Sequence, residues 1–311
     1  MAVLYNSGAG SVTDAESWRE AFRKLDPEIE LRVWPDTGPV EDIEFVLAWY
    51  PKTGDLNRYP NLKAVFWLGA GVDWLLRQKD LPAVPFVRLV DPGLTAGMTE
   101  YVLLHTLRYH RRQPEIDEAQ RRREWIDIVY PLPWNRRVGI LGLGVLGRAA
   151  ALKLAALDFD VAGWSRTPKS IEGVACFHGN DQLQAFLART EILVCLLPLT
   201  PATQGIIDAK LLAALPRGAC FINAGRGGHV VDADLLAALD SGQIAHATLD
   251  VFTTEPLPPD HPYWTHPRVT VTPHVASITH AETAAAGIYD GMKRVRAGLP
   301  LDNVVDFERG Y

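Results

Sequence analysis

Three side chains with the chemistry for acid–base catalysis and anion binding each follow a short apolar run in the second half of the chain. They are Arg226 after Phe221–Asn223, Glu255 after Thr248–Phe252, and His274 after Val269–Thr272. Arginine binds a carboxylate through paired charge-assisted hydrogen bonds, and histidine exchanges a proton near neutral pH. Such a set suits reduction of a carbonyl beside a carboxylate, as in a 2-keto acid. Arg226 would orient the substrate, His274 would protonate the carbonyl oxygen, and Glu255 would favour the protonated imidazole.

Each of these residues alone has an ordinary structural explanation. A single arginine is most often part of a surface ion pair, a glutamate before proline is most often a loop charge, and a histidine after proline is most often structural. The three together, downstream of a nucleotide-binding motif, favour catalysis over these explanations.

That motif is a glycine-rich loop between a predicted strand, 138–141, and a predicted helix, 148–157. It reads G-x-G-x-x-G, and its members are Gly142, Gly144, Val145, Leu146 and Gly147. The first glycine permits the tight turn, the second lets a pyrophosphate approach the backbone, and the third lets helix and strand pack closely. A plain glycine turn is the alternative, but the strand before it and the helix after it favour dinucleotide binding.

The end of the next predicted strand, Asp160–Trp164, indicates which dinucleotide is preferred. An enzyme that uses NAD usually has Asp or Glu there to bind the ribose 2′-hydroxyl. This chain has hydroxyl and basic groups instead: Ser165, Arg166, Thr167 and Lys169. These groups suit a 2′-phosphate, so NADPH is expected and NADH is less favoured. The alternative is that Arg166 stacks on the adenine of NAD.

The elements that must position these residues alternate between short apolar runs and helical patterns, which is typical of βαβ units. In the first half, strands are expected at Val3–Tyr5, Glu30–Val33, Phe45–Trp49 and Lys63–Trp67, with a helix near Ala15–Lys24. One long helix is expected from Gly97 to Glu124, and a last helix over Ala281–Ala297. Further strands are expected at 138–141, 160–164 and 192–197, besides those before the three chemical residues.

The predicted fold class is therefore α/β, with two Rossmann-like domains built on doubly wound parallel sheets. A flavodoxin-like substrate domain is expected over 1–97 plus 285–311, discontinuous in sequence, and a dinucleotide-binding Rossmann domain over 98–284.

Composition excludes several other classes. The chain has 311 residues, is 48% hydrophobic and carries a formal net charge of −6, which argues against nucleic-acid binding. The three cysteines form no CxxC pair, and neither a signal peptide nor a transmembrane span is expected, so a cytoplasmic protein is predicted. No metal site is expected.

Three sequence blocks resemble the D-isomer-specific 2-hydroxyacid dehydrogenase family: Asn223–Gly227, Asp250–Leu257 and Thr272–His274. The resemblance covers nearly the whole chain, including Trp67–Asp73. It is strongest to the glyoxylate/hydroxypyruvate reductase A subgroup, through Trp164–Arg166, Glu255–Pro259 and Arg309–Tyr311. Glu255 argues against the formate dehydrogenase branch, where Gln takes that place.

The resemblance implies roles for further residues. Catalysis is assigned to Arg226, Glu255 and His274, and substrate binding to Trp49, Ala70, Gly71, Val72 and Arg226. Tyr50 also falls where the subgroup lines its substrate pocket. Cofactor contacts are implied for Leu197, Pro198, Thr203, Ala224, Gly225 and Asp250, the last toward the nicotinamide carboxamide. The family is commonly dimeric, so a homodimer is expected, but Trp125 and Trp134 receive no role because the spacing of Trp125–Trp134 departs from the subgroup.

The expected function is NADPH-dependent reduction of small 2-keto acids, glyoxylate to glycolate and hydroxypyruvate to D-glycerate. One alternative is a sibling dehydrogenase for a bulkier 2-keto acid or for phosphite. Another is a nucleotide-sensing binding protein like the corepressors of the family, which keep the catalytic residues. The absence of extra tails for partner peptides disfavours that second alternative.

Overall fold

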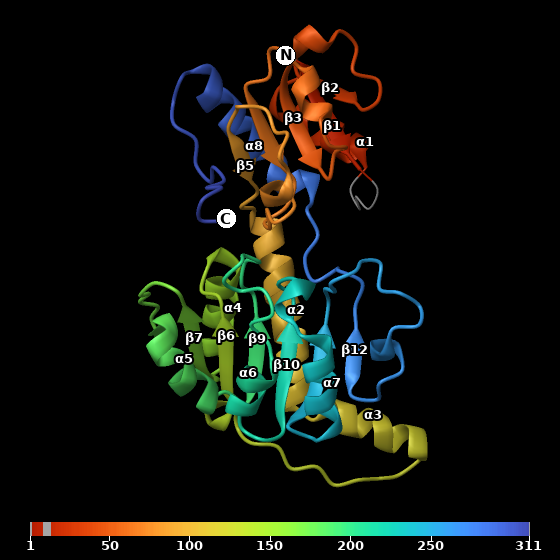
Figure 1. The fold of residues 1–311 in the computed structure, drawn as a ribbon, viewed down its shortest axis with the longest axis vertical. Coiled ribbons are helices and arrows are strands. Elements are labelled where there is room, and N and C mark those ends of the chain that lie inside the picture. The colour runs from red at the N-terminus through yellow and green to blue at the C-terminus, as the bar shows by residue number, and fades with distance from the viewer. Residues whose placement is uncertain (1, 9–13, 311) are drawn as a thin grey trace. The chain divides into compact units, whose positions relative to one another are not determined.

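The chain forms two parallel β-sheets covered by helices, as a computed structural model shows for residues 2–8 and 14–310 (Figure 1). The chain divides into two contact units. The first unit holds the described residues as far as Thr95 and those from Ile278 onward, and the second runs from Ala96 to Ser277. The predicted α/β class with doubly wound parallel sheets is confirmed.

The first unit is built on a five-stranded sheet of order β2-β1-β3-β4-β5, which is the flavodoxin-like order. Its strands are β1 (Ala2–Ser7), β2 (Glu30–Val33), β3 (Ile43–Trp49), β4 (Ala64–Trp67) and β5 (Phe86–Arg88). Its helices are α1 (Ala15–Leu25), the first turn of α2 (Pro92–His110) and α8 (Ala281–Arg296). Helix α8 packs against α1, and its Ile288 and Met292 are buried with Trp18 and Phe22 in one core.

The second unit is built on a seven-stranded sheet of order β12-β11-β10-β9-β6-β7-β8. Its strands are β6 (Arg137–Leu141), β7 (Asp160–Ser165), β8 (Ala175–His178), β9 (Ile192–Cys195), β10 (Ala219–Asn223), β11 (Ile244–Leu249) and β12 (Val269–Val271). Its helices are the rest of α2, α3 (Gln113–Arg122), α4 (Val145–Ala155), α5 (Gly179–Ala188), α6 (Ala209–Ala214) and α7 (Asp232–Asp240). The order reverses between β6 and β9, and ligands bind at the carboxyl ends of strands at such a switch point.

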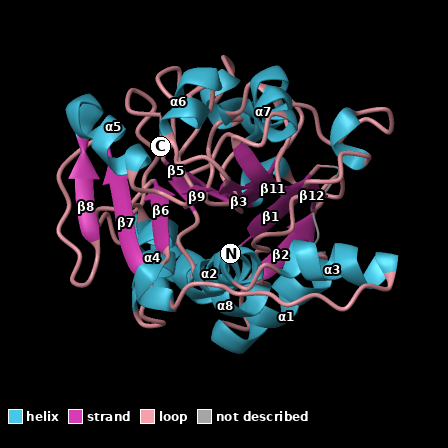
Figure 2. Cartoon of the chain, turned by 90° about the horizontal axis from the view of Figure 1, so that it is seen from below, coloured by secondary structure: helices cyan, strands magenta, loops and turns pink. Residues whose placement is uncertain are grey.

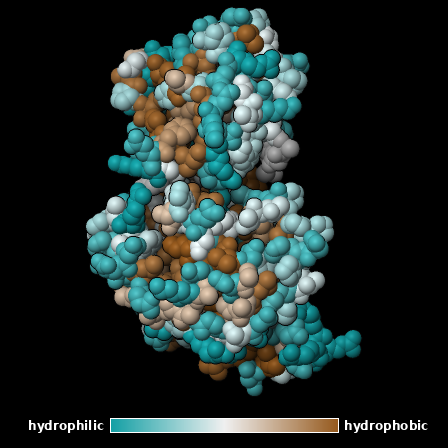
Figure 3. Space-filling model, viewed as in Figure 1, coloured by the Kyte–Doolittle hydropathy of each residue, from teal (hydrophilic) through white to brown (hydrophobic). Residues whose placement is uncertain are grey.

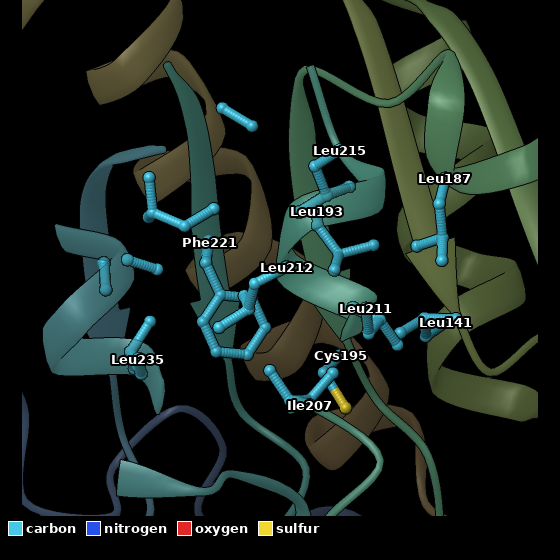
Figure 4. Packing of buried hydrophobic residues seen from close by; sticks show 14 of the residues in the cluster. Leu141, Leu187, Leu193, Cys195, Ile207, Leu211, Leu212, Leu215, Phe221 and Leu235 are labelled. Atoms are coloured by element: carbon cyan, nitrogen blue, oxygen red, sulfur yellow. The ribbon is translucent and has the colours of Figure 1, made fainter. Parts of the chain in front are cut away.

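Helices cover both faces of this second sheet. Figure 2 shows α5, α6 and α7 on one side and α2 and α4 on the other. The first side is a dense apolar core in which Leu193 and Phe221 of the sheet pack with Leu212 and Leu235 of the helices (Figure 4). Because both faces are buried, the central strands are rigid and their carboxyl ends are fixed platforms for side chains.

The prediction of a single long helix from Gly97 to Glu124 is wrong. Two helices occupy the segment: α2 begins earlier, at Pro92, and α3 follows after a break. Arg112 at the break has φ 56°, in the left-handed region. Pro114 lies in the first turn of α3, where its missing N–H costs no hydrogen bond.

Smaller differences concern strand ends. β9 ends at Cys195 rather than Leu197, and β11 ends at Leu249 rather than Phe252, so the residues beyond are loops. β5 is a strand that the sequence pattern did not indicate; it has three residues and follows a proline-rich stretch.

Candidate active site

The site is built from the carboxyl ends of neighbouring strands in the second unit. β10, β11 and β12 lie side by side in parallel, and the chain after each one carries Arg226, Glu255 and His274 respectively. Nδ1 of His274 lies 2.7 Å from Oε2 of Glu255. The two side chains remain 36% and 35% exposed, so the hydrogen-bonded pair is open to solvent and to a ligand.

The environment of Glu255 favours its ionised form. Burial would raise the pKa of this carboxyl group, but the hydrogen bonds from His274 and from the main-chain N–H of Phe252, together with the charges of His274 and Arg226, lower it overall. The Phe252 N–H donates to Oε1 at 2.8 Å, which leaves Oε2 for the imidazole. A fixed carboxylate on Nδ1 leaves Nε2 as the ring nitrogen available for proton transfer.

The main chain of His274 is held in an unusual conformation. Its φ is 53°, in the left-handed region that residues other than glycine rarely adopt. Its N–H donates to the carbonyl oxygen of Asp250 at 2.8 Å. The Asp250 carboxylate accepts from the N–H groups of Val275 and Ala276, both at 2.9 Å, and from the hydroxyl of Thr272 at 2.6 Å. Asp250, 1% exposed, therefore fixes the turn that presents the His274 imidazole.

The Arg226 loop is held by its own residues. The Asn223 side chain accepts from the Gly225 N–H at 3.2 Å and donates to the Arg226 carbonyl at 3.1 Å. A Cβ atom on Gly227 would lie 1.8 Å from the carbonyl carbon of Phe252, so only glycine fits there. This close approach joins the loop after β10 to the loop after β11, which brings the Arg226 charge close enough to lower the pKa of Glu255.

The glycine-rich loop has the form that a dinucleotide needs. Gly142 has φ 102°, and a Cβ on Gly147 would lie 1.8 Å from the Gly142 carbonyl oxygen, so the turn and the helix pack tightly. Around the Cβ position of Gly144 nothing lies within 4 Å, so the N-terminus of α4 is open at this point. Backbone N–H groups facing open space at a helix N-terminus suit a pyrophosphate, and the loop therefore fits the group. Val145, 45% exposed, and Leu146 form the first turn beside it.

The predicted ribose site lies at the end of β7. The Ser165 hydroxyl donates to the Thr167 carbonyl at 2.8 Å and shapes the turn that carries Arg166. Arg166 and Lys169 are exposed. No described side chain between 165 and 169 is a carboxylate.

The loop after β9 carries the third set of predicted cofactor contacts. Leu197 is 7% exposed, and the carbonyl oxygen of Pro198 accepts the Thr203 hydroxyl at 2.7 Å. Ala224 and Gly225 follow β10, the neighbouring strand.

The residues expected to bind substrate through backbone N–H groups lie in the first unit. Ala70, Gly71 and Val72 form the loop after β4, whose Gly71 carbonyl accepts the Trp67 indole N–H at 2.9 Å. Trp49 packs against Trp67 with ring centroids 5.2 Å apart, and a Cβ on Gly69 would lie 2.2 Å from the Trp49 ring. Tyr50 joins the same aromatic group. These contacts are internal to the first unit.

Two features of the second unit were not singled out from the sequence. One is the hydrogen-bonded chain from Tyr101 through Thr272 to Asp250. The other is His229, fully buried beside the Arg226 loop. Thr272 and Asp250 lie in two of the sequence blocks, but their hydrogen bonds to each other and to Tyr101 cannot be read from residue type. His229 belongs to no motif, although a histidine three residues after Arg226 could have drawn attention as a group able to accept from the loop. Tyr311 of the terminal block lies outside the described residues.

The site and fold define an oxidoreductase with a dinucleotide-binding domain, and comparison with known proteins gives its family. Residues 103–276, more than half of the chain, match the model "D-isomer specific 2-hydroxyacid dehydrogenase, NAD binding domain". The chain belongs to the D-isomer-specific 2-hydroxyacid dehydrogenase family, as its sequence blocks predict.

The curated relatives include the glyoxylate/hydroxypyruvate reductase A of Serratia proteamaculans, 45% identical over 304 residues, or 96% of this chain and 97% of that protein. A 2-hydroxyacid dehydrogenase from Xanthobacter autotrophicus, solved with NADPH and MES, is 48% identical, with a TM-score of 0.96 over 100% of this chain and 99% of that one. The NADPH-dependent glyoxylate/hydroxypyruvate reductase of Sinorhizobium meliloti, solved with NADP and sulfate, is 40% identical, with a TM-score of 0.92 over the same shares. The expected resemblance to the reductase A subgroup is confirmed.

Among the described residues, no helix has both the length and the apolar character to cross a membrane.

Proposed function

We propose that this protein reduces small 2-keto acids with NADPH, with glyoxylate and hydroxypyruvate as its substrates. The observation that carries the proposal is the 2.7 Å pair of His274 and Glu255 at neighbouring strand ends, in the same unit as the glycine-rich loop. A paired imidazole at the carboxyl edge of a dinucleotide-binding sheet is suited to proton transfer to a carbonyl oxygen.

In this proposal the three residues divide the work. The Arg226 guanidinium binds the substrate carboxylate and orients the carbonyl group. His274 holds a proton at Nε2 and delivers it to the carbonyl oxygen as charge develops there. Glu255 binds Nδ1 and stabilises the protonated ring between turnovers, because its lowered pKa keeps it ionised.

NADPH is the proposed cofactor because relatives at 48% and 40% identity were solved with NADPH and NADP. Bound, it supplies the hydride. Gly142, Gly144, Val145, Leu146 and Gly147 would hold its pyrophosphate. Ser165, Arg166, Thr167 and Lys169 would hold the 2′-phosphate through hydroxyl and cationic groups. Leu197, Pro198, Thr203, Ala224, Gly225 and Asp250 would line the rest of the cofactor site.

The first unit is the proposed substrate domain. The loop of Ala70, Gly71 and Val72 would present backbone N–H groups to the substrate carboxylate, and Trp49 would limit the size of the substrate. The second unit is then the dinucleotide-binding domain. The proposed division assigns residues 1–97 and 285–311 to the former and 98–284 to the latter.

We also propose a cytoplasmic homodimer. The segment after α3 exposes apolar side chains, with Trp125 97% and Val129 86% exposed, which favours contact with another protein surface. Apolar patches are also visible between polar atoms on the face in Figure 3. Cys176, Cys195 and Cys220 are free thiols, which suits a reducing compartment.

The test is a panel of 2-keto acids assayed with NADPH and with NADH. The proposal predicts the highest kcat/KM for glyoxylate or hydroxypyruvate with NADPH. A preference for phenylpyruvate would favour the bulkier-substrate dehydrogenase. Phosphite is assayed in the opposite direction, with NADP+ or NAD+ as the oxidant, and its oxidation would favour the phosphite enzyme. No turnover of any compound, together with tight nucleotide binding, would favour the sensing protein.

A further inference from the structure

Behind the Arg226 loop lies a buried histidine that the proposed mechanism does not use. His229 ends a short 3-10 turn, Gly227–His229, that directly follows Arg226, and its side chain is 0% exposed. Its main chain is fixed on both sides: its N–H donates to the Arg226 carbonyl at 3.2 Å, and its carbonyl accepts the Ile207 N–H at 2.8 Å.

The imidazole of His229 contacts both proposed ligand loops. Nδ1 lies 3.2 Å from the main-chain nitrogen of Arg226, and Nε2 lies 3.3 Å from the carbonyl oxygen of Pro198. Arg226 is the proposed substrate-orienting residue, and Pro198 belongs to the proposed cofactor-lining loop after β9. One rigid ring therefore spans the two loops.

These two contacts determine where the ring carries its proton. A main-chain N–H only donates, so Nδ1 must offer a lone pair to Arg226. A carbonyl oxygen only accepts, so Nε2 must carry the hydrogen for Pro198. The neutral Nε2–H form satisfies both partners, whereas a doubly protonated ring would place an N–H against the N–H of Arg226.

The surroundings allow the ring little room to move. A Cβ on Gly225 would lie 3.2 Å from Nδ1 and Cε1 of the ring and 3.1 Å from the Leu197 carbonyl oxygen, so glycine at 225 lets the ring lie against the main chain. Sγ of Cys195 also lies 3.8 Å from Nδ1 of the ring. Figure 4 shows Cys195 beside Ile207 in the apolar core, so this neighbour of the ring is itself held by packed side chains.

We infer that His229 is a positioning residue that sets the Arg226 loop at a fixed distance from the Pro198 loop, and so places the substrate carboxylate relative to the cofactor. This inference rests on the proposed function. A misplacement of the order of 1 Å in such a site costs about 100-fold in rate, so a rigid spacer between the two loops has direct kinetic value.

The kinetic experiment uses two amide substitutions, each of which imitates one half of the imidazole. His229→Asn places an acceptor near the Nδ1 position but is too short to reach Pro198. His229→Gln reaches the Nε2 position but moves the acceptor away from Arg226. We expect His229→Gln to lower kcat/KM for the keto acid by about 10- to 100-fold, and His229→Asn to lower it less, while the Kd for NADPH changes by less than about threefold in both.

The matched control is His110→Asn, which changes another buried histidine, 3% exposed, at the end of α2, where its ring packs against Tyr130 and Phe159. It should leave kcat/KM within about twofold of the wild type. Equal losses in His229→Gln and His110→Asn, unchanged kinetics in both His229 variants, or a parallel loss of NADPH binding would each overturn the positioning role.

A second measurement does not depend on turnover. Nitrogen NMR of the protein labelled at histidine should show His229 with a bare Nδ1 and a protonated Nε2, unchanged between about pH 5 and about pH 8. A ring that gains a second proton in this range would overturn the inference. A wild-type protein that keeps this NMR signature but reduces no keto acid would contradict the proposed function instead.

Discussion

The hydroxyl groups of Tyr101 and Thr272 lie 2.8 Å apart, and Thr272 in turn donates to Oδ1 of Asp250 at 2.6 Å. Thr272 has a single hydroxyl hydrogen, and it donates this hydrogen to the Asp250 carboxylate. Tyr101 must therefore be the donor in the first bond. Burial raises the pKa of Tyr101, so the phenol keeps its proton. The chain from α2 to Asp250 thus has one direction, and it ends on the residue that fixes the His274 turn.

Thr272→Val tests this chain. The valine keeps the shape but leaves the Tyr101 hydroxyl without its acceptor and Asp250 without one donor. We expect a loss of about 1–3 kcal/mol in the free energy of unfolding, measured with urea, and a fall in kcat of about tenfold because the His274 turn loosens.

The control for this variant is Thr248→Val. Thr248 also pairs with a tyrosine of α2, Tyr109, at 2.6 Å, but no hydrogen bond joins it to Asp250 in the described structure. The Thr248→Val variant should lose about as much free energy of unfolding as Thr272→Val, but its kcat should equal that of the wild type. Equal kcat losses in the two variants would show that the chain has no special relation to His274.

His274→Ala removes the proposed proton donor. The expected result is a fall in kcat of about 100- to 10,000-fold with the Kd for NADPH nearly unchanged, since the imidazole is not a proposed cofactor contact. Fluorescence titration with NADPH and steady-state kinetics measure the two quantities. His266→Ala, which removes an imidazole paired with Asp240 at 3.3 Å, is the matched control and should keep full activity. Loss of NADPH binding in His274→Ala would contradict the assigned role.

Glu255→Gln separates the electrostatic role of the carboxylate from its shape. In the wild type the lowered pKa of Glu255 keeps it ionised as the pH falls below the usual range of a glutamate, with His274 and Arg226 as its charged neighbours. A neutral amide can accept from Nδ1 but carries no charge, so it stabilises a protonated imidazole less than a carboxylate does, and activity should decline sooner as the pH rises. We expect kcat to fall about threefold at the acid end of the profile and about 100-fold at the basic end. A uniform loss across the pH profile would contradict this role.

Arg166→Asp should reverse the cofactor preference. The new carboxylate repels a 2′-phosphate and offers an acceptor to a 2′-hydroxyl, so the ratio of kcat/KM for NADPH to that for NADH should fall by about 100-fold or more. Lys153→Asp, an equal charge change on the exposed face of α4, should leave the ratio within about twofold. If Arg166 only stacks on adenine, its substitution should weaken the binding of NADPH and of NADH equally and leave the ratio unchanged.

His105 should make the stability of the protein depend on pH. Burial, aided by the positive charge of Arg108, lowers the pKa of this histidine to about 4 from its usual 6.5. The folded state therefore stays unprotonated between these values while the unfolded chain binds a proton. The folded state has its full free energy of unfolding above pH 6.5. The part of this free energy that is linked to His105 is lost progressively as the pH falls from 6.5 toward 4. The difference amounts to about 3 kcal/mol. The free energy of unfolding of His105→Gln, measured with urea, should fall less between pH 6.5 and pH 4 than that of the wild type. The same pH dependence in the variant and the wild type would contradict this role of His105.

The sequence predicted the meeting of Glu255 and His274 at one edge of the sheet better than it predicted the helices and turns that connect the strands. Glu255 and His274 follow adjacent parallel strands, so strand order alone brings them to one edge. The break at Arg112 was missed because a left-handed arginine leaves no signal in residue type, and Pro114 is tolerated in a first helical turn. His229 was missed because its proposed positioning role depends on two contacts to main-chain atoms, those of Arg226 and Pro198. These contacts are visible in the three-dimensional structure and not in the pattern of residue types.

The left-handed backbone of His274 sets function against stability at this position. A residue with a Cβ is disfavoured at φ 53°, and glycine adopts that angle without strain. Selection for stability alone would therefore remove the imidazole. His274→Gly should give a protein whose melting temperature is equal to or above that of the wild type and whose activity is lost. We therefore expect the conformation at this position to cost stability, and efforts to raise thermal tolerance by consensus or glycine design should leave His274 unchanged.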